Sequence, residues 1–383
     1  MKKVAFIATG YIVKYDGVSV YTENLLREFL SLKRDDLLLD VYVSKSAKDL
    51  FVKRVFDGGV PKSAEMISIK DSGALAKIID LQKRVLFKRD YDLVFIPNPM
   101  PLFFTSGKRV KVIHDLTIKR TPKLFSKKMH IYIDFLVFCM KYFDDALGYI
   151  SDQTKGDICR FYNVKPQQKE MLYLPNGIPF KVMQNARVDM KEIYKKYEQK
   201  RIKFIVVGRI NRSKGFDRLL KFLKYFDLYL QKSDFESVVV HVVGKQTHET
   251  KSILEGCSFK NIVLDFLGYT DDETLNDLYK KSHFCFFLSR NEGYGLPLVE
   301  SMWFGAIAIV SDIEVFNEIL TSRYPKFDDQ SGYEEAIKEF IEKIYNDRNY
   351  LSFIFGLINE AVEREKSGYK KAAQNLLNYL YEN

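Results

Sequence analysis

The sequence predicts an α/β protein of two doubly wound domains, each a parallel β-sheet covered on both sides by helices, with a cleft between them. Three observations predict this fold class. The chain has 383 residues, too many for one typical core and suited to two domains of nearly equal size. Short apolar, β-branched runs alternate with segments of helical periodicity throughout. A turn-rich stretch from Leu174 to Pro179 separates the two halves.

Ten short apolar runs, five in each half, are expected to be buried parallel strands. They are Val4–Ala8, Leu38–Val43, Leu93–Ile96, Val110–Ile113, Ala146–Ile150, Phe204–Val207, Ser237–Val243, Ile262–Phe266, Phe284–Leu288 and Ala306–Val310. Helices are expected in the gaps. The clearest run from about Val20 to Leu32 and from about Lys128 to Phe143, where apolar side chains recur at helical spacing.

These elements set the domain boundaries. The first domain is expected to span residues 1–180 and the second residues 201–350, with a charged, helix-prone linker at 181–200. Residues 351–383 are expected to form helices that pack back toward the first domain.

The predicted helix from about Lys128 to Phe143 is apolar nearly all round. Ile131, Phe135 and Phe138 belong to this pattern, together with Leu136, Val137 and Met140. An all-round apolar helix is expected to be buried between other elements, and the alternative is partial insertion at a membrane surface. We expect burial.

Composition narrows the class of protein. Hydrophobic residues make up 46% of the chain, so each half can bury a core and disorder is excluded. No apolar run is long enough to span a membrane, and the first residues are expected to form a buried strand rather than a signal peptide. Cys139, Cys159, Cys257 and Cys285 are widely spaced, which predicts reduced thiols in a cytoplasmic protein with neither a disulfide nor zinc.

The excess of positive over negative charge is confined to the first half of the chain. Net charge is +10, and residues 1–180 hold 30 Lys and Arg against 20 Asp and Glu. Between Lys108 and Lys128, eight cations face one acid, Asp115, and phenylalanines are interspersed or adjacent. Such a segment suits acidic lipid headgroups, a diphosphate-linked acceptor or nucleic acid, and the alternative is an ordinary solvated face.

A basic turn follows the first strand of the second half. It reads Gly208-Arg209-Ile210-Asn211-Arg212-Ser213-Lys214-Gly215 and leads into a helix. Cations at the carboxyl end of a parallel strand lie where a diphosphate binds in doubly wound sheets, so Arg209 and Lys214 are candidate phosphate ligands. The turn is not a Walker loop, because Lys214 precedes the glycine.

A second loop carries two carboxylates and two glycines. It reads Ser289-Arg290-Asn291-Glu292-Gly293-Tyr294-Gly295-Leu296-Pro297-Leu298-Val299-Glu300 between a strand and a helix that Pro297 can open. The glycines let the backbone approach a ligand and leave amides at a helix N-terminus free for sugar oxygens or phosphate.

Glu292 and Glu300, separated by seven residues in the context Glu-Gly-Tyr-Gly-Leu-Pro-Leu-Val-Glu, resemble the hallmark of the retaining glycosyltransferase family 4. Four other features agree in order. They are the Gly-Arg-x4-Lys-Gly turn, Asn176-Gly177-Ile178, Phe266-Leu267-Gly268-Tyr269 and His114-Asp115. The resemblance covers nearly the whole chain and is strongest between residues 204 and 320. It implies the GT-B fold, two facing Rossmann-like domains of which the first binds the acceptor and the second the nucleotide sugar.

The resemblance also implies roles for the residues that bind the donor. Glu300 would accept hydrogen bonds from the ribose, and Glu292 would hold hydroxyls of the donor sugar. The backbone at Gly208, with Arg209 and Lys214, would meet the diphosphate, and the two cations would neutralise the charge that develops on it. The remaining donor contacts would come from the amides of Gly293, Tyr294, Gly295 and Leu296 and from a base pocket lined by Leu267, Gly268 and Tyr269.

In the first domain, the resemblance places His114 next to the transferred sugar and the backbone of Gly17 near the phosphates. Many relatives carry a glycine pair in this first loop, whereas here Asp16 precedes a single glycine. This departure counts against a close approach of Gly17 to the donor, and the alternative is that Asp16 faces the acceptor.

The resulting hypothesis is retaining transfer of a hexose from a UDP- or GDP-sugar to a glycan or lipid-linked saccharide, as in bacterial surface polysaccharide biosynthesis such as lipopolysaccharide. We expect no essential metal, because cationic side chains do the neutralising, and we expect the Asp90-Tyr91-Asp92 pair to be a solvated turn. The protein is expected in the cytoplasm, and a further hypothesis is peripheral association with the cytoplasmic face of the inner membrane through Lys108–Lys128. The alternatives are a nucleotide-sugar epimerase or a sugar phosphorylase of the same fold, and a nucleic-acid-binding protein.

Overall fold

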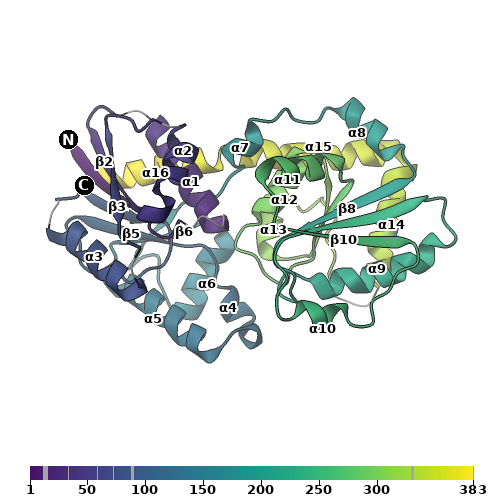
Figure 1. Ribbon diagram of the computed structural model, residues 1–383, viewed down its shortest axis with the longest axis horizontal. Coiled ribbons are helices and arrows are strands. Elements are labelled where there is room, and N and C mark those ends of the chain that lie inside the picture. The colour runs from purple at the N-terminus through teal and green to yellow at the C-terminus, as the bar shows by residue number, and fades with distance from the viewer. Residues whose placement is uncertain are drawn as a thin grey trace. The chain divides into compact units, whose positions relative to one another are not determined.

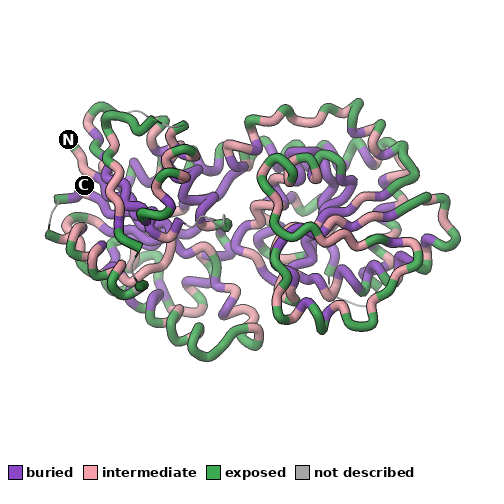
Figure 2. Tube along the Cα trace, viewed as in Figure 1, coloured by how far each residue is buried: buried purple, intermediate pink, exposed green. Residues whose placement is uncertain are grey.

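The computed structural model describes residues 1–11, 16–32, 34–57, 59–71, 73–87, 90–328 and 332–382. They form two compact units (Figure 1). Unit 1 comprises Met1–Gly177 and Ser367–Asn383, and unit 2 comprises Ile178–Lys366. Each unit is a parallel sheet with helices on both faces, and the strands of both sheets are largely buried (Figure 2).

Unit 1 has a seven-stranded sheet in the order β3-β2-β1-β4-β5-β6-β7. The strands are β1 Lys2–Ile7, β2 Leu37–Ser44, β3 Ala64–Ile69, β4 Leu93–Ile96, β5 Lys108–Ile113, β6 Ala146–Tyr149 and β7 Glu170–Tyr173. The helices are α1 Gly17–Ser31, α2 Lys48–Phe56, α3 Ala74–Phe87, α4 Thr117–Arg120, α5 Lys127–Phe143, α6 Asp152–Tyr162 and α16 Gly368–Tyr381, with 3₁₀ turns Lys45–Ala47 and Pro122–Leu124.

Unit 2 has a five-stranded sheet in the order β10-β9-β8-β11-β12. The strands are β8 Arg201–Val207, β9 Ser237–Val243, β10 Ile262–Gly268, β11 Phe284–Phe287 and β12 Ile307–Val310. The helices are α7 Phe180–Met183, α8 Met190–Tyr197, α9 Phe216–Leu230, α10 Thr250–Leu254, α11 Asp272–Lys281, α12 Leu296–Trp303, α13 Glu314–Ile319, α14 Tyr333–Asn346 and α15 Arg348–Glu365.

Both sheets reverse their strand order beside the first strand. In unit 1 the reversal lies between β1 and β4, and in unit 2 between β8 and β11. At such a reversal the loops leave the two neighbouring strands in opposite directions and open a crevice at the carboxyl edge, where ligands of doubly wound sheets bind. The fold therefore provides one candidate crevice in each unit.

Strands β3 and β7 were not predicted from the sequence, while the ten predicted strands all correspond to strands of the structure. Both missed strands lie at an edge of the first sheet. Each has one neighbour and is only partly buried, so neither carries the continuous apolar run that marks a central strand.

The chain divides at other positions than the sequence analysis proposed. The expected linker, residues 181–200, contains α7 and α8, which belong to unit 2. Of the C-terminal helices, α15 also belongs to unit 2, and only α16 packs in unit 1, against α1 and β7. In Figure 1 the yellow end of the chain accordingly lies among the purple elements of the N-terminus.

Helix α5 is not buried all round, and the prediction of burial is wrong for its outer face. Leu136, Val137 and Met140 are buried against the sheet, but Ile131, Phe135 and Phe138 are exposed. The reason is geometric, because one side of α5 packs on the sheet and these three side chains lie on the other side. No helix in the described part of the chain is long and apolar enough to cross a membrane.

Candidate functional site

The predicted donor-binding residues of unit 2 lie at the carboxyl edge of its sheet. Gly208 follows β8, Leu267 and Gly268 end β10, and Glu292 follows β11. Because β8 and β11 are neighbours at the strand reversal, their two following loops share the crevice.

The turn after β8 is pressed against the end of β11. Gly215 has a φ of +69°, and a Cβ at this position would lie 1.8 Å from the carbonyl oxygen of Leu288. Only glycine fits this left-handed conformation at such a close approach. The turn is also held from within, since the amide of Lys214 donates to Asn211 Oδ1 at 3.0 Å. These contacts fix the direction in which Lys214 leaves the backbone.

Lys214 and Glu292 form a bidentate ion pair. The ammonium of Lys214 lies 2.7 Å from both carboxylate oxygens of Glu292. Ser289 donates its hydroxyl to Oε1 of the same carboxylate at 2.7 Å. The sequence analysis assigned Glu292 to the donor sugar and Lys214 to the diphosphate. It did not predict that the two side chains bind each other. The two side chains neutralise each other's charge.

A second ion pair joins the loop after β11 to the first turn of α9, and a backbone hydrogen bond beside it joins the two loops. The guanidinium of Arg290 donates to both carboxylate oxygens of Asp217 at 2.8 Å, and the amide of Arg290 donates to the carbonyl of Ser213 at 2.9 Å. Sequence reasoning did not assign a role to either residue. A bidentate arginine–carboxylate pair has a fixed geometry, so it holds the lysine and glutamate loops in register.

Arg209 differs from Lys214 in having no internal partner. Its side chain is exposed and makes no ion pair with any residue that the structure describes. The backbone beside it is closely packed, because a Cβ on Gly244, at the end of β9, would lie 2.0 Å from the carbonyl oxygen of Gly208. A cation that is already solvent-facing beside the crevice can bind an anion without first breaking an ion pair.

Glu300 lies on α12, the helix that follows the loop after β11. Tyr279 of α11 donates its hydroxyl to Glu300 Oε2 at 3.1 Å. Burial raises the pKa of the Glu300 carboxyl to about 7, and the hydrogen bond from Tyr279 opposes the rise only in part. The site therefore contains a carboxyl group that changes charge near neutral pH.

The loop before α12 presents backbone amides. Gly295 caps the helix and Pro297 occupies its first turn. The amides of Gly293, Gly295 and Leu296 have no acceptor among the described residues. Tyr294 is different, because its ring is buried and its hydroxyl donates to Glu365 Oε2 at 2.6 Å. The tyrosine side chain anchors the loop to the end of α15, which leaves the helix N-terminus open to an anion.

Leu267, Gly268 and Tyr269 lie at the far end of the same edge. They close β10, which is separated from β8 by β9. Leu267 is partly exposed and Tyr269 is exposed. The side chains of Leu267 and Tyr269 are therefore accessible. They follow or end a strand that lies two positions from β8, the strand that precedes Lys214.

In unit 1, His114 follows β5 at the carboxyl edge. Its Nε2 lies 2.6 Å from the carbonyl oxygen of Pro97, and its ring packs edge-on against Tyr21. Burial lowers the pKa of His114, so the ring is neutral near pH 7. A neutral ring that donates from Nε2 to a carbonyl has Nδ1 left as an acceptor.

Gly17 is the first residue of α1, and Asp16 caps this helix by accepting from the amide of Ser19 at 2.8 Å. The carboxylate of Asp16 is thus engaged by its own helix. Residues 12–15, which precede it in the first loop, lie outside the described residues.

Two further polar residues at this edge were not predicted. Asn98 follows β4, and its Oδ1 is buried without a hydrogen-bond partner. Thr9 follows β1, and its Oγ1 is in the same state. Buried polar atoms without partners are rare. The only signal in the sequence is their place just after a strand, which many residues share.

Most of the basic segment Lys108–Lys128 does not form an anion-binding surface. Arg109 and Lys111 are buried in the sheet and pair with Asp144. Lys119 pairs with Asp134, and Arg120 with Asp157. Because β5 is a central strand, its alternate side chains point inward regardless of their charge. The charges that remain at the surface lie at the end of the segment.

Asp90-Tyr91-Asp92 is part of the framework. Asp92 accepts from the ammonium of Lys2 at 3.0 Å, and Tyr91 donates to Asp40 at 2.6 Å. These residues precede β4, so they lie at the amino edge of the sheet, opposite the crevice. Among the described residues, no group of three or more His, Cys, Asp or Glu is placed to hold a metal ion.

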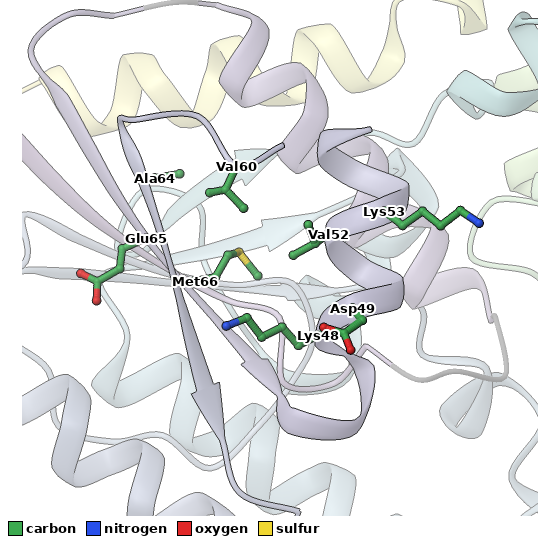
Figure 3. Close-up of a pocket in the computed structure, with 8 residues that line it drawn as sticks. All are labelled: Lys48, Asp49, Val52, Lys53, Val60, Ala64, Glu65 and Met66. Atoms are coloured by element: carbon green, nitrogen blue, oxygen red, sulfur yellow. The ribbon is translucent and has the colours of Figure 1, made fainter. Parts of the chain in front are cut away.

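A surface hollow of about 560 Å³ lies elsewhere in unit 1, between α2 and β3 (Figure 3). The side chains of Val52, Val60 and Met66 gather in it, and Lys48 and Glu65 lie at its rim. None of the predicted site residues lines this hollow.

Known proteins resemble this chain in part of its sequence and in its fold. Residues 189–354, most of unit 2, match the family model "Glycosyl transferases group 1". The chain is 31% identical over 143 residues to the serotype-specific mannosyltransferase WbdA of Escherichia coli, over 36% of this chain and 17% of that protein. It is 26% identical over 231 residues to the O-antigen chain mannosyltransferase RfbU of Salmonella typhimurium, over 59% of each. The chain thus spans less than two thirds of either relative.

Among solved structures, HepE of Anabaena in complex with UDP-glucose is similar over 99% of both chains, with a TM-score of 0.69 and 15% identity. Similarity at this level of identity establishes the fold. The chain has the α/β fold of the GT-B structures, and the part that matches the glycosyl transferases group 1 model is the one that carries Lys214, Glu292 and Glu300.

Proposed function

We propose that the protein is a retaining glycosyltransferase that moves a hexose from a nucleoside diphosphate sugar to a glycan or lipid-linked saccharide in the biosynthesis of a surface polysaccharide. One observation carries this proposal. Arg209 and Lys214 follow β8, Glu292 and the amides at the start of α12 follow β11, these strands are neighbours at the strand reversal, and Lys214 pairs with Glu292. The family match and the two mannosyltransferase relatives support it.

The diphosphate is proposed to bind between Arg209, Lys214 and the N-terminus of α12. Arg209 is exposed, the amides of Gly293, Gly295 and Leu296 have no acceptor among the described residues, and the helix dipole favours an anion there. Lys214 then shares its charge between Glu292 and a phosphate oxygen. As the leaving group departs, charge grows on that oxygen, and pre-positioned cations stabilise it.

The two glutamates are proposed to hold the rest of the donor. When Lys214 turns toward phosphate, Glu292 regains acceptor capacity for sugar hydroxyls, while Ser289 keeps the carboxylate in place. Glu300 accepts from the ribose hydroxyls in its ionised form. Leu267 and Tyr269, whose side chains are accessible, are proposed to contact the base.

Retention of configuration is proposed to follow from a front-face reaction. The carboxylate of Glu292 is held by Lys214 and Ser289, which disfavours its use as a nucleophile. In the proposed step, the bond between C1 and the leaving phosphate oxygen breaks. The acceptor oxygen bonds to C1 on the same face, and its proton passes to the leaving phosphate. The protein contributes position and charge stabilisation.

The acceptor is proposed to bind to unit 1. His114 offers Nδ1 as an acceptor for a sugar hydroxyl, and the unpaired oxygens of Thr9 and Asn98 offer two more polar groups at the same edge. We propose that the acceptor is carried on a lipid at the cytoplasmic face of a membrane. The reaction is proposed to need no metal, which predicts full activity in a chelator.

The test is a transfer assay with the purified chain, nucleoside diphosphate hexoses and a lipid-linked saccharide. Mannose donors with guanosine and uridine are the first choice, because two relatives are named mannosyltransferases. Release of nucleoside diphosphate only when acceptor is present supports a transferase. Interconversion of the sugar without acceptor would show an epimerase, and dependence on free phosphate would show a phosphorylase.

A further inference from the structure

We propose that the outer face of α5, continued by α3, docks unit 1 onto the surface of an anionic phospholipid bilayer. This inference deepens the proposed function, because it names the partner surface that would bring the enzyme to a lipid-linked acceptor. It rests on a stripe of exposed apolar side chains and on the charges around it.

The stripe on α5 follows one side of the helix. Ile131, Phe135, Phe138 and Tyr142 are 71%, 52%, 54% and 60% exposed. Their spacing of four, three and four residues places them above one another on consecutive turns. Isolated exposed apolar residues are ordinary, but a continuous row of large ones marks an interaction site.

Folding of unit 1 does not account for this stripe. The opposite side of α5 already packs on the sheet, where Val137 and Met140 belong to a buried cluster with Ile113, Leu147 and Ile158. The helix would be amphipathic in the usual way if its outer side were polar. Its outer side is apolar instead, so the sequence carries an apolar face that the fold leaves open.

The apolar surface extends from α5 to α3. The ring of Phe103 packs on Phe135 at a centroid distance of 6.2 Å. The amides of Phe103 and Phe104 donate to Oε1 of Gln82 on α3, at 3.0 and 3.3 Å. Gln82 shares a helix side with the exposed Leu75 and Ile79, at spacings of seven and three residues. The two helices and the exposed ring of Phe104 thus form one surface.

The charges bordering this surface are positive. Lys123, Lys127 and Lys128 are exposed and have no ion-pair partner among the described residues. The acids nearby are engaged, since Asp134 pairs with Lys119 and Asp80 with Arg84.

Lysines in the first turn of α5 oppose the helix dipole, which favours acids at that position. Helix stability therefore does not explain them. Aromatic rings with flanking lysines are the composition that binds anionic bilayer surfaces, where the rings enter the headgroup boundary and the ammonium groups meet lipid phosphates.

The same charges argue against a second copy of the chain as the occupant. A two-fold dimer pairs the same patch of both copies, so it brings no acidic group that would neutralise the lysines. An anionic surface neutralises them instead. The length of α5, 17 residues, also fits a helix that lies in the membrane interface rather than one that crosses the bilayer.

The test is co-sedimentation of the full chain with sucrose-loaded vesicles of phosphatidylcholine and phosphatidylglycerol, compared with phosphatidylcholine alone. We expect binding to the anionic vesicles that falls steeply with added salt. Replacing Lys123, Lys127 and Lys128 together with glutamine is expected to weaken binding about 100-fold. Phe135→Ser with Phe138→Ser is expected to abolish it, and Ile131→Ser to weaken it by at least about tenfold.

Leu228→Ser, at an exposed leucine of α9 in unit 2, is the matched control and should bind like the wild type. Circular dichroism melting separates loss of binding from loss of folding, and Ile131, the most exposed of the stripe, is the safest site in this respect. No binding to anionic vesicles at low salt overturns the proposal, as does a dimer in light scattering that Ile131→Ser dissociates. The vesicle assay contains no sugar donor, so it tests membrane binding alone. Sugar transfer to a soluble acceptor, measured without vesicles, tests the proposed function separately.

Discussion

Glu300→Gln gives a test of the site that can be followed through protein stability. In the folded chain the pKa of this carboxyl is about 7, against an ordinary value of 4.5. A raised acid pKa means that the folded chain holds the proton more tightly than the unfolded chain does. Ionisation therefore destabilises the fold, starting as the pH rises through 4.5 and reaching its full extent above pH 7. At about 1.4 kcal/mol per pKa unit, the full effect is about 3 kcal/mol.

Glutamine keeps an acceptor for Tyr279 and cannot ionise. Relative to the wild type, the free energy of unfolding of the variant should therefore rise by about 3 kcal/mol between pH 4 and pH 8. The assay is urea unfolding followed by fluorescence of Trp303, the one tryptophan of the chain, which lies buried on the same helix. Glu339→Gln, at an exposed position of α14, is the control. Parallel stability curves for wild type and Glu300→Gln across this pH range would refute the argument.

Four further outcomes are expected. Lys214→Ala should weaken binding of a nucleoside diphosphate by about 10- to 100-fold in calorimetry, because a charge-assisted contact is lost. An unchanged affinity would exclude Lys214 from the phosphate site. Lys224→Ala on α9 is the control variant. Glu300 should make nucleotide affinity of the wild type rise from pH 6 to pH 8, as the carboxylate form accepts from ribose, and Glu300→Gln should flatten the dependence. Gly215→Ala should cost about 2 to 4 kcal/mol of stability, since its Cβ would meet Leu288 at 1.8 Å, and a wild-type melting temperature would contradict this packing. His114→Ala should slow sugar transfer by at least about tenfold with nucleotide affinity unchanged, and a loss of nucleotide affinity instead would assign it another role.

The sequence was sufficient to predict the central strands of both sheets, because buried parallel strands consist of continuous apolar runs. It did not reveal the edge strands β3 and β7, where one open side allows polar residues such as Glu65. The outer face of α5 was wrongly predicted to be buried, because periodicity tells which residues are apolar but not whether a partner covers them.

For the site, the sequence identified residues but not their pairings. Glu292 was assigned to the sugar and Lys214 to the diphosphate of the same donor, yet the two residues, 78 positions apart in the chain, form one ion pair. The Arg290–Asp217 pair, the Tyr294–Glu365 contact and the open oxygen of Asn98 likewise depend on which loops become neighbours. Conversely, Arg109 and Lys111 were counted as surface charge, because their pairing with the distant Asp144 cannot be recognised before the chain is folded.

The central claim is that a nucleoside diphosphate binds to unit 2 at the loops after β8 and β11. Hydrogen–deuterium exchange of the full chain, with and without UDP or GDP, tests it directly. The account predicts slower exchange in peptides that cover residues 208–216 and 289–301, with no change along α2 and β3, where the hollow of unit 1 lies. Protection confined to α2 and β3, with the loops after β8 and β11 unaffected at saturating nucleotide, would contradict it.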